Sequence, residues 1–232
     1  MMNIYFLTED SKSFRIILPE WLHYVLPDYV KIKSMEEFQS GGNYYMVQDG
    51  GGYPRIKKWA SQTIETFTEN SIPLDYFVIL WDGDAKDEDE IQEAIKEFNS
   101  VFTQWPVQFQ YRLFVMRHCF ETWLLGNRAV YPHDHIARTF APFAQFYNVS
   151  IDDPEQMLEP EGYTASVSTY HRRYLQEMLR NSIHKNYSKG HPAVAAEESY
   201  WDELCLRVGQ TLDLRSFANF LDFLHQCGTQ SL

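Results

Sequence analysis

Short apolar segments alternate with amphipathic segments over the first half of the chain. The apolar, β-favouring runs predict strands at residues 3–7, 43–47, 76–81 and 108–116. Helical spacing of apolar residues predicts helices at about 13–25, 55–68, 88–102 and from 118 onward. We expect Pro19 to interrupt the first of these helices, because proline removes a backbone donor.

The order of these elements predicts an α/β fold. Strands that alternate with helices form a mostly parallel sheet flanked by helices. The alternation of strand and helix patterns ends after Asn127. A loop-rich stretch follows, and then helical patterns at about 168–181, 195–206 and 214–227. We therefore expect an α/β domain over residues 1–128 and a helical C-terminal extension over 129–232, packed on that domain.

Composition narrows the class of protein. Of 232 residues, 44% are hydrophobic, which is enough for a real core. The net charge of −12 argues against a module that only coats nucleic acid, because phosphate contacts need basic residues. Three scattered cysteines without a CxxC motif indicate a reducing, cytoplasmic environment. No apolar run approaches the roughly 18 residues of a membrane helix, so we expect no membrane association.

The strongest chemical signal is a pair of aspartates, Asp82 and Asp84, directly after the strand YFVILW. Two carboxylates at this spacing on a turn can face one Mg²⁺ ion, which prefers hard oxygen ligands and retains several waters. The alternative is a polar loop that only precedes the next helix. A phosphatase of the haloacid dehalogenase type also carries such a pair, but it continues with threonine or valine where Lys86 stands.

Two further signals follow other predicted strands. Glu9 comes after the first strand, and it would share an edge with Asp82 if the two strands are neighbours. The alternative for Glu9 is an acidic residue that leads into a helix. Gly50, Gly51 and Gly52 lie between a strand and a helix, where backbone amides can bind a phosphate. The alternative for these glycines is a flexible loop.

The later part of the chain offers weaker candidates. Glu121, in HCFETWLLGN, lies either on the solvent-facing side of a helix or toward a site, and the pattern alone favours the solvent-facing side. Lys185 and Lys189 belong to the main basic segment, SIHKNYSKGH. This segment could hold a phosphate backbone or form a solvated surface.

Together these pieces resemble a Toprim domain, the fold shared by topoisomerases, primases and overcoming-lysogenization-defect (OLD) nucleases. Glu9 matches the glutamate after the first strand of that fold, and Asp82 with Asp84 match its later DxD motif. The segments IYFLTED, DGGGYPRI, FVILWDGD, HCFETWLLGN and NYSKGHP resemble small stand-alone bacterial Toprim proteins of the OLD-like kind. The resemblance covers about residues 3–127, and Asp10 stands where the family has a glycine.

The resemblance also implies roles for the later residues. Glu121, two residues before Trp123, matches a recurrent glutamate, and Lys189 matches a late lysine for which Lys185 is the alternative. The resemblance implies a metal-dependent nuclease that acts on a nucleic-acid substrate, and it suggests phage defence as the biological role. The implied cofactor is Mg²⁺ or Mn²⁺, and an ATPase partner and a homo-oligomer remain open.

Each candidate residue has an expected role in such a nuclease. Asp82, Asp84 and Glu121 would be metal ligands, and Glu9 would be a ligand or general base. Lys189 would neutralise charge on the reacting phosphate. The alternatives are a catalytically silent or partner-dependent binding module of the same fold, and a phosphatase acting on a small substrate.

Overall fold

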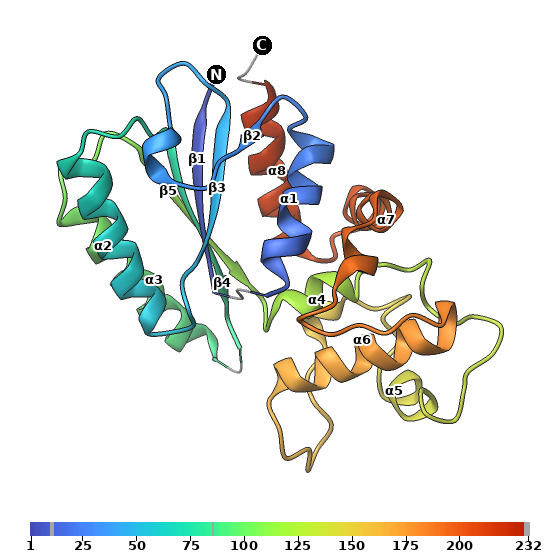
Figure 1. Cartoon of the computed structure of the whole chain (residues 1–232). Helices are drawn as coiled ribbons and strands as arrows, with labels where there is room; N and C mark the ends of the chain where they lie inside the picture. Colours follow the sequence, from blue (N-terminus) through green and yellow to red (C-terminus); the bar gives the residue numbers. More distant parts are fainter. Residues whose placement is uncertain (10–11, 85, 230–232) are drawn as a thin grey trace. The chain divides into compact units, whose positions relative to one another are not determined.

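The computed structural model describes residues 1–9, 12–84 and 86–229, which form an α/β fold (Figure 1). The strands are β1 (Asn3–Thr8), β2 (Val30–Lys31), β3 (Tyr44–Asp49), β4 (Tyr76–Asp82) and β5 (Gln110–Met116). The α-helices are α1 (Phe14–Val25), α2 (Arg55–Glu69), α3 (Glu88–Thr103), α4 (Phe120–Leu124), α5 (Ala141–Phe146), α6 (Val167–Ile183), α7 (Glu198–Gln210) and α8 (Arg215–Thr229). Short 3₁₀ turns are η1 (Met35–Glu37), η2 (Pro154–Gln156) and η3 (Ala193–Ala196).

The strands form one parallel sheet in the order β2-β3-β1-β4-β5. The first strand is therefore central, with β3 on one side and β4 on the other. Thr8, the last residue of β1, pairs with Asp49 of β3 and with Leu80 of β4. The predicted α/β class with a mostly parallel sheet is confirmed, and β1 and β4 are the neighbours that the prediction for Glu9 required.

The described chain divides into two compact units. The described residues of the first are 1–9, 12–81, 86–115 and 222–229, and those of the second are 82–84 and 116–221. This division differs from the predicted boundary at residue 128 in three respects, the first being that the turn at 82–84 belongs to the second unit. The segment from Met116 already belongs to the second unit, and the last turns of α8 belong to the first.

The core of the first unit has two apolar layers, because successive residues of a strand point to opposite faces. Tyr5, Leu7 and Ile79 pack with the buried residues of α2 and α3. Ile4 and Phe6 are also fully buried, on the opposite face of β1. Figure 1 places α1 on that face and α2 with α3 on the other. The sheet is therefore buried on both sides, as its unbroken apolar runs predicted.

The expectation that Pro19 interrupts the first helix was wrong. Helix α1 continues through Pro19 from Phe14 to Val25. Proline removes the hydrogen bond to the carbonyl four residues earlier, which here belongs to Arg15. Arg15 is exposed, so solvent can reach the helix face on which that carbonyl loses its partner.

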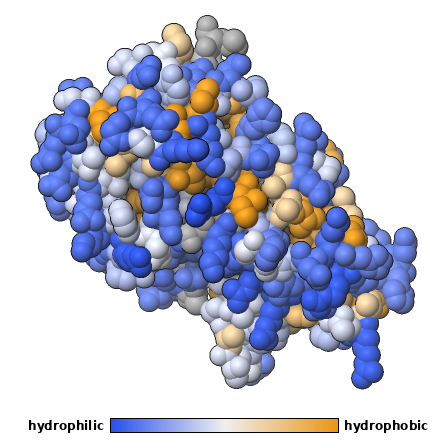
Figure 2. Space-filling model, in the orientation of Figure 1, coloured by the Kyte–Doolittle hydropathy of each residue, from blue (hydrophilic) through white to orange (hydrophobic). Residues whose placement is uncertain are grey.

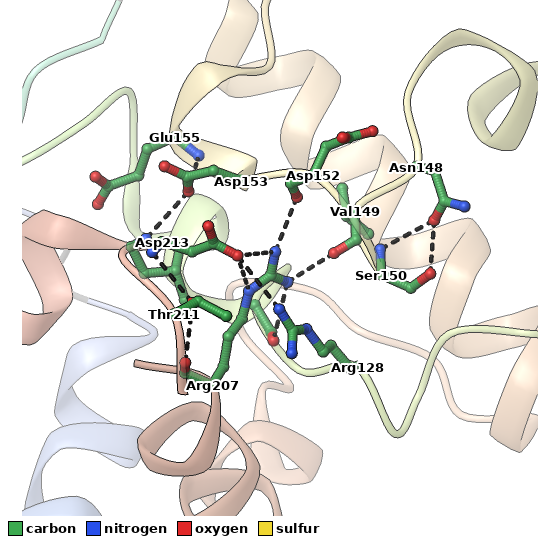
Figure 3. Close-up of polar contacts among 12 residues, drawn as sticks. Arg128, Asn148, Val149, Ser150, Asp152, Asp153, Glu155, Arg207, Thr211 and Asp213 are labelled. Carbon is green, nitrogen blue, oxygen red and sulfur yellow. Dashed lines mark hydrogen bonds and ion pairs between the residues drawn. The ribbon is translucent and has the colours of Figure 1, made fainter. Parts of the chain in front are cut away.

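The second unit contains a buried arginine that ties several loops together (Figure 3). Arg207 of α7 is almost fully buried, and its guanidinium donates to the backbone carbonyls of Val149, Asp152 and Gly126. It also donates two hydrogen bonds to Asp213, at 3.0 and 2.8 Å. A buried charge needs such partners to offset the loss of hydration. This unit is therefore organised around a polar centre as well as around apolar contacts.

Hydrophilic residues cover most of the face seen in Figure 2, with hydrophobic residues in smaller patches. Within residues 1–9, 12–84 and 86–229, no helix combines the length and the hydrophobicity that crossing a bilayer requires. Among the described strands and α-helices, the two-residue strand β2 and the short helix α5 were not predicted from the sequence.

Candidate functional site

The turn from Asp82 to Asp84 is fixed to the segment that follows β5. The backbone N–H of Gly83 donates to the carbonyl of Met116 at 2.9 Å, and that of Asp84 donates to the carbonyl of His118 at 2.6 Å. Asp84 and His118 both have positive φ angles, of 50° and 65°. Non-glycine residues rarely adopt this conformation and do so at a cost of order 1–3 kcal/mol each. Two such residues bonded to each other mark a locally strained turn.

The side chain of Asp84 is held by helix α6 of the same unit. Its Oδ1 accepts a hydrogen bond from the Ser168 hydroxyl at 2.7 Å. Ser168 lies in the first turn of α6, whose N-cap Ser166 accepts a bond from the backbone N–H of Thr169. The capped helix start therefore fixes the position of the hydroxyl that orients Asp84.

Asp82 and Glu121 are buried carboxylates in the same unit, with 6% and 1% exposure. The expectation that Glu121 faces solvent was wrong. Helix α4 has only five residues, and every one of them is buried, so it has no solvent-facing side. Burial, followed by the charges of Glu121 and Asp82, raises the pKa of the Cys119 thiol well above its usual value. Both carboxylates therefore act on one thiol, which stays protonated and is a poor nucleophile.

A tyrosine connects Glu121 to the segment that carries the candidate lysines. The Tyr187 hydroxyl donates to Oε1 of Glu121 at 3.3 Å. Lys189, two residues later, is half-buried in a turn closed by the pairing of Ser188 with His191, whereas Lys185 is exposed. Lys185 also lies two residues from Tyr187, so its greater exposure is what distinguishes it from Lys189.

Two buried histidines complete this neighbourhood. Nε2 of His171 lies 2.9 Å from the carbonyl of Met157, which can only accept, so Nε2 carries the proton. Nδ1 then accepts from the Thr122 hydroxyl at 2.8 Å. Burial, and secondarily the charge of His118, lowers the pKa of His171 to about 3, so its ring is neutral. Burial also lowers the pKa of His118, whose Nδ1 lies 3.4 Å from the carbonyl of Asp84.

Glu9 and the glycine loop belong to the first unit. The backbone N–H of Glu9 donates to the carbonyl of Leu80 at 3.0 Å, so Glu9 extends the pairing of β1 with β4. Oε1 of Glu9 accepts from the backbone N–H of Tyr53 at 2.8 Å. A Cβ added at Gly52 would lie 3.7 Å from the same oxygen. The carboxylate therefore lies against the glycine loop.

Two of the three loop amides already have oxygen partners within the chain. The N–H of Gly50 donates to the carbonyl of Thr8, and that of Gly51 donates to Oδ1 of Asp49. Gly51 and Gly52 both have positive φ angles, which is why glycine is needed at these two positions. The phosphate-binding role of Gly50, Gly51 and Gly52 stays a prediction, and it would require a phosphate to replace these contacts.

The predicted residues thus fall into two groups. Asp82, Asp84, Glu121 and Lys189 belong to the second unit, and Glu9 belongs to the first with Gly50, Gly51 and Gly52. Asp10, which replaces the glycine of the family pattern, lies outside the described residues.

The candidate residues of the second unit include three carboxylates, and carboxylate oxygens are ligands that a hard divalent cation prefers. In the described ranges, no three or more His, Cys, Asp or Glu side chains are arranged to hold a metal ion. Mg²⁺, however, often takes only one or two protein carboxylates and completes its shell with water and phosphate oxygens. Asp82 and Glu121 are carboxylates of the kind such a site uses, and their role as metal ligands stays a prediction.

A hollow of about 540 Å³ lies elsewhere in the first unit and is a weaker candidate for a catalytic site. It is lined by residues at the amino ends of β1 and β4, including Asn3 and Asp75. Asp75 accepts from the backbone N–H of Asn3 at 2.7 Å, so it has a structural role. In parallel sheets, catalytic groups gather at the opposite, carboxyl ends of the strands. We therefore place the candidate site with the acidic turn.

Sequence reasoning did not identify several residues of this neighbourhood. His118 could have been found, because it comes two residues after the end of the last predicted strand, where a parallel sheet places its functional groups. Ser168 and Tyr187 gave no local signal, since they reach Asp84 and Glu121 across 84 and 66 residues of sequence. Comparison of the chain with family models, with curated proteins and with solved structures gave no significant match.

Proposed function

We propose that this protein is a metal-dependent nuclease that cleaves phosphodiester bonds, with its acidic centre at Asp82, Asp84 and Glu121. The observation that carries the proposal is the strained turn of Asp84 and His118, fixed beside two buried carboxylates. Strained backbone is maintained where the surrounding structure over-determines it, and it clusters at functional sites. The resemblance to OLD-like Toprim proteins supports the same residues.

Each residue has a defined task in this proposal. Asp82, Asp84 and Glu121 would hold Mg²⁺ or Mn²⁺, which supplies Lewis-acid activation of the phosphate and of a water molecule. Ser168 keeps the Asp84 carboxylate in one orientation through its hydrogen bond. Tyr187 does the same for Glu121. Glu9 is proposed as a further ligand or the general base.

The remaining predicted residues would act on the substrate. Lys189 would neutralise negative charge that develops on the phosphate, because an ammonium group stabilises such charge strongly in a site that excludes water. Its half-buried position supports this role over one for the exposed Lys185. A phosphate at Gly50, Gly51 and Gly52 would compete with the carboxylate of Asp49 for the N–H of Gly51.

A second candidate function is a binding module whose activity depends on a partner. The burial of Asp82 and Glu121 favours it, because a substrate phosphate must reach these groups and they are covered in this conformation. In that case a partner, such as an ATPase, would open the acidic centre. A phosphatase acting on a small substrate has no comparable observation in its support.

The deciding experiment is a cleavage assay with the full chain. Plasmid, linear DNA and RNA are each incubated with Mg²⁺, Mn²⁺ or EDTA. We expect metal-dependent cleavage that falls by at least about a hundredfold in Asp82→Asn, since an amide replaces a carboxylate ligand. Asp134→Asn is the matched control, because Asp134 is an exposed acid of the same unit.

The outcomes separate the candidates. Full cleavage by Asp82→Asn would contradict the assignment of the site. No cleavage under any condition would favour the partner-dependent module. Ser168→Ala adds a finer test, because it should lower kcat without changing the identity of the metal that supports activity.

A further inference from the structure

One face of helix α2 combines features that the acidic centre does not use. Arg55, Lys58, Trp59 and Gln62 occur at helical spacing, so they share one face, and Pro54 precedes them. These five residues line a hollow of about 520 Å³ that is open to solvent. We call this surface the α2 hollow.

Trp59 is an unusual residue to find there. It is 39% exposed, while Trp21, Trp81, Trp123 and Trp201 are buried and Trp105 is half-buried. Within the described part of the chain, its ring makes no contact with another aromatic ring or with a cation. The indole face is therefore available to a planar group from outside.

The two cations of the α2 hollow are also uncompensated. Among the described residues, neither Arg55 nor Lys58 forms an ion pair, whereas the neighbouring Lys57 pairs with Glu97. None of the five lining residues is acidic, although the chain carries a net charge of −12. The surface thus offers two positive charges and an open aromatic ring in an otherwise acidic protein.

We propose that the α2 hollow binds a single strand of nucleic acid, with a base stacked on Trp59 and phosphates bound by Arg55 and Lys58. Single strands present unpaired bases, and stacking on aromatic side chains with cations along the backbone is how they are commonly bound. In a duplex the bases are stacked on one another, and Trp59 has no free base to meet. The inference rests on the proposed nuclease function, since it names single strands as the substrate class.

The position of the hollow within the first unit is consistent with this role. Pro54 directly follows Tyr53, whose backbone N–H binds Glu9. The side chain of Arg55 lies against the glycine loop, because a Cβ added at Gly51 would meet its Nε at 2.9 Å. A strand bound in the hollow would therefore continue toward the loop that contacts Glu9.

The test measures binding without cleavage. A fluorescein-labelled oligodeoxythymidine of about 20 nucleotides, long enough to span one such site, is titrated with the full chain in EDTA. We expect Trp59→Ala to weaken binding by about tenfold or more and Trp59→Phe to weaken it less, because stacking is lost in the first and partly kept in the second. Lys96→Ala is the control, since Lys96 is an exposed lysine on α3.

Salt dependence tests the two cations separately. Each phosphate contact to a single strand contributes about 0.7 to the slope of log affinity against log salt. The double variant Arg55→Ala/Lys58→Ala should therefore reduce that slope by about 1.4, while Lys96→Ala leaves it unchanged. The total tryptophan fluorescence of the protein should also be quenched on binding, and the quench should be smaller in Trp59→Phe, which keeps only the other five tryptophans.

The results distinguish this inference from the proposed function. Unchanged binding in all α2 variants, or no binding by the natural sequence, would overturn the inference. Equal affinity for a blunt duplex, or preference for vesicles containing an anionic lipid, would also overturn it. Cleavage that depends on Asp82 but not on Trp59 would leave the nuclease standing without this surface. Binding that depends on Trp59, in a protein that cleaves no substrate with any metal, would support the binding surface and contradict the proposed nuclease.

Discussion

The two units of the molecule are stabilised in different ways. In the first unit, both faces of a parallel sheet are covered by helices, and the buried residues are almost all apolar. In the second unit, the buried set includes Arg207, His171, Glu121 and His118. Apolar burial is proportional to area and has no direction, whereas a buried polar group depends on each partner and its geometry.

This contrast explains where the candidate chemistry lies. A core that needs only shape and hydrophobicity tolerates substitution but offers few reactive groups. A polar interior holds carboxylates and imidazoles out of water, where their charges interact strongly and their pKa values shift. The second unit has the features expected of a site, and we expect it to be the more sensitive to removal of single polar groups.

The largest expected effect is the loss of the buried arginine. Arg207→Leu should lower the free energy of unfolding by about 4–5 kcal/mol. The reason is that it leaves the largely buried Asp213 carboxylate without its main counterion. Three backbone carbonyls would lose their donor as well. Urea denaturation followed by circular dichroism would measure the change.

Two further variants sharpen this prediction. Adding Asp213→Leu to Arg207→Leu should recover only part of the loss, because the carbonyl groups remain unpaired. Arg128→Leu should cost about 1 kcal/mol or less, since Arg128 makes a single 3.4 Å contact with Asp213 and is partly exposed. Equal effects of Arg207→Leu and Arg128→Leu would show that the buried centre is not the main support of this unit.

The matching test of the first unit removes apolar volume. Phe98→Ala should lower the free energy of unfolding by about 3–4 kcal/mol, through lost burial and the cavity left behind. Phe98 is fully buried, and its ring lies 5.6 Å from that of Trp81. Val30→Ala is the control and should cost about 1 kcal/mol or less, because Val30 belongs to the first unit and is 55% exposed. Similar losses in both variants would argue against an apolar core as the source of stability.

Acid should destabilise the protein through His171. Its folded pKa of about 3 lies below the value of about 6.5 in an unfolded chain, so the unfolded state binds more protons between these values. The contribution of His171 to the free energy of unfolding is therefore fully present above about pH 6.5. It decreases as the pH falls, by about 3 kcal/mol at pH 4.

His171→Gln isolates this contribution, because a glutamine side chain does not titrate. From pH 7 to pH 4, the free energy of unfolding of the natural protein should fall by about 3 kcal/mol more than that of His171→Gln. Parallel curves for the two proteins over this range would contradict a buried, neutral histidine.

The smallest effect is expected from a surface ion pair of the first unit. Lys96→Ala should change the free energy of unfolding by less than about 0.5 kcal/mol, because both charges of its pair with Glu93 are exposed to solvent. Thermal denaturation at low and high salt would measure it. A larger effect would mean that surface charge contributes more to the first unit than its apolar core implies.

Much of the first unit could be predicted from the sequence, because its strands and helices follow local patterns. The run YFVILW is apolar without interruption, and it forms β4, buried on both faces. Strand β2 was missed because two residues, Val30 and Lys31, carry no periodic signal. The pairing of β2 with β3 depends on residues that lie some fourteen positions later in the chain.

Less of the candidate site could be predicted. The positions of Glu9 and Asp82 after their strands were apparent, since parallel strands end at one edge of the sheet. The burial of Glu121 was not, because a five-residue helix is too short to show an apolar stripe. Its partner Tyr187 lies 66 residues away in the sequence.

The sequence by itself determined the strands, most of the helices and the placement of acidic residues at strand ends, because these depend on the hydrophobicity and spacing of near neighbours. Only the tertiary structure decided the left-handed backbone of Asp84 and His118, the burial of Glu121 and the role of Arg207. Each of these depends on contacts between segments far apart in the chain. Such contacts supply the partners that make a strained turn or a buried charge stable, and no local pattern encodes them.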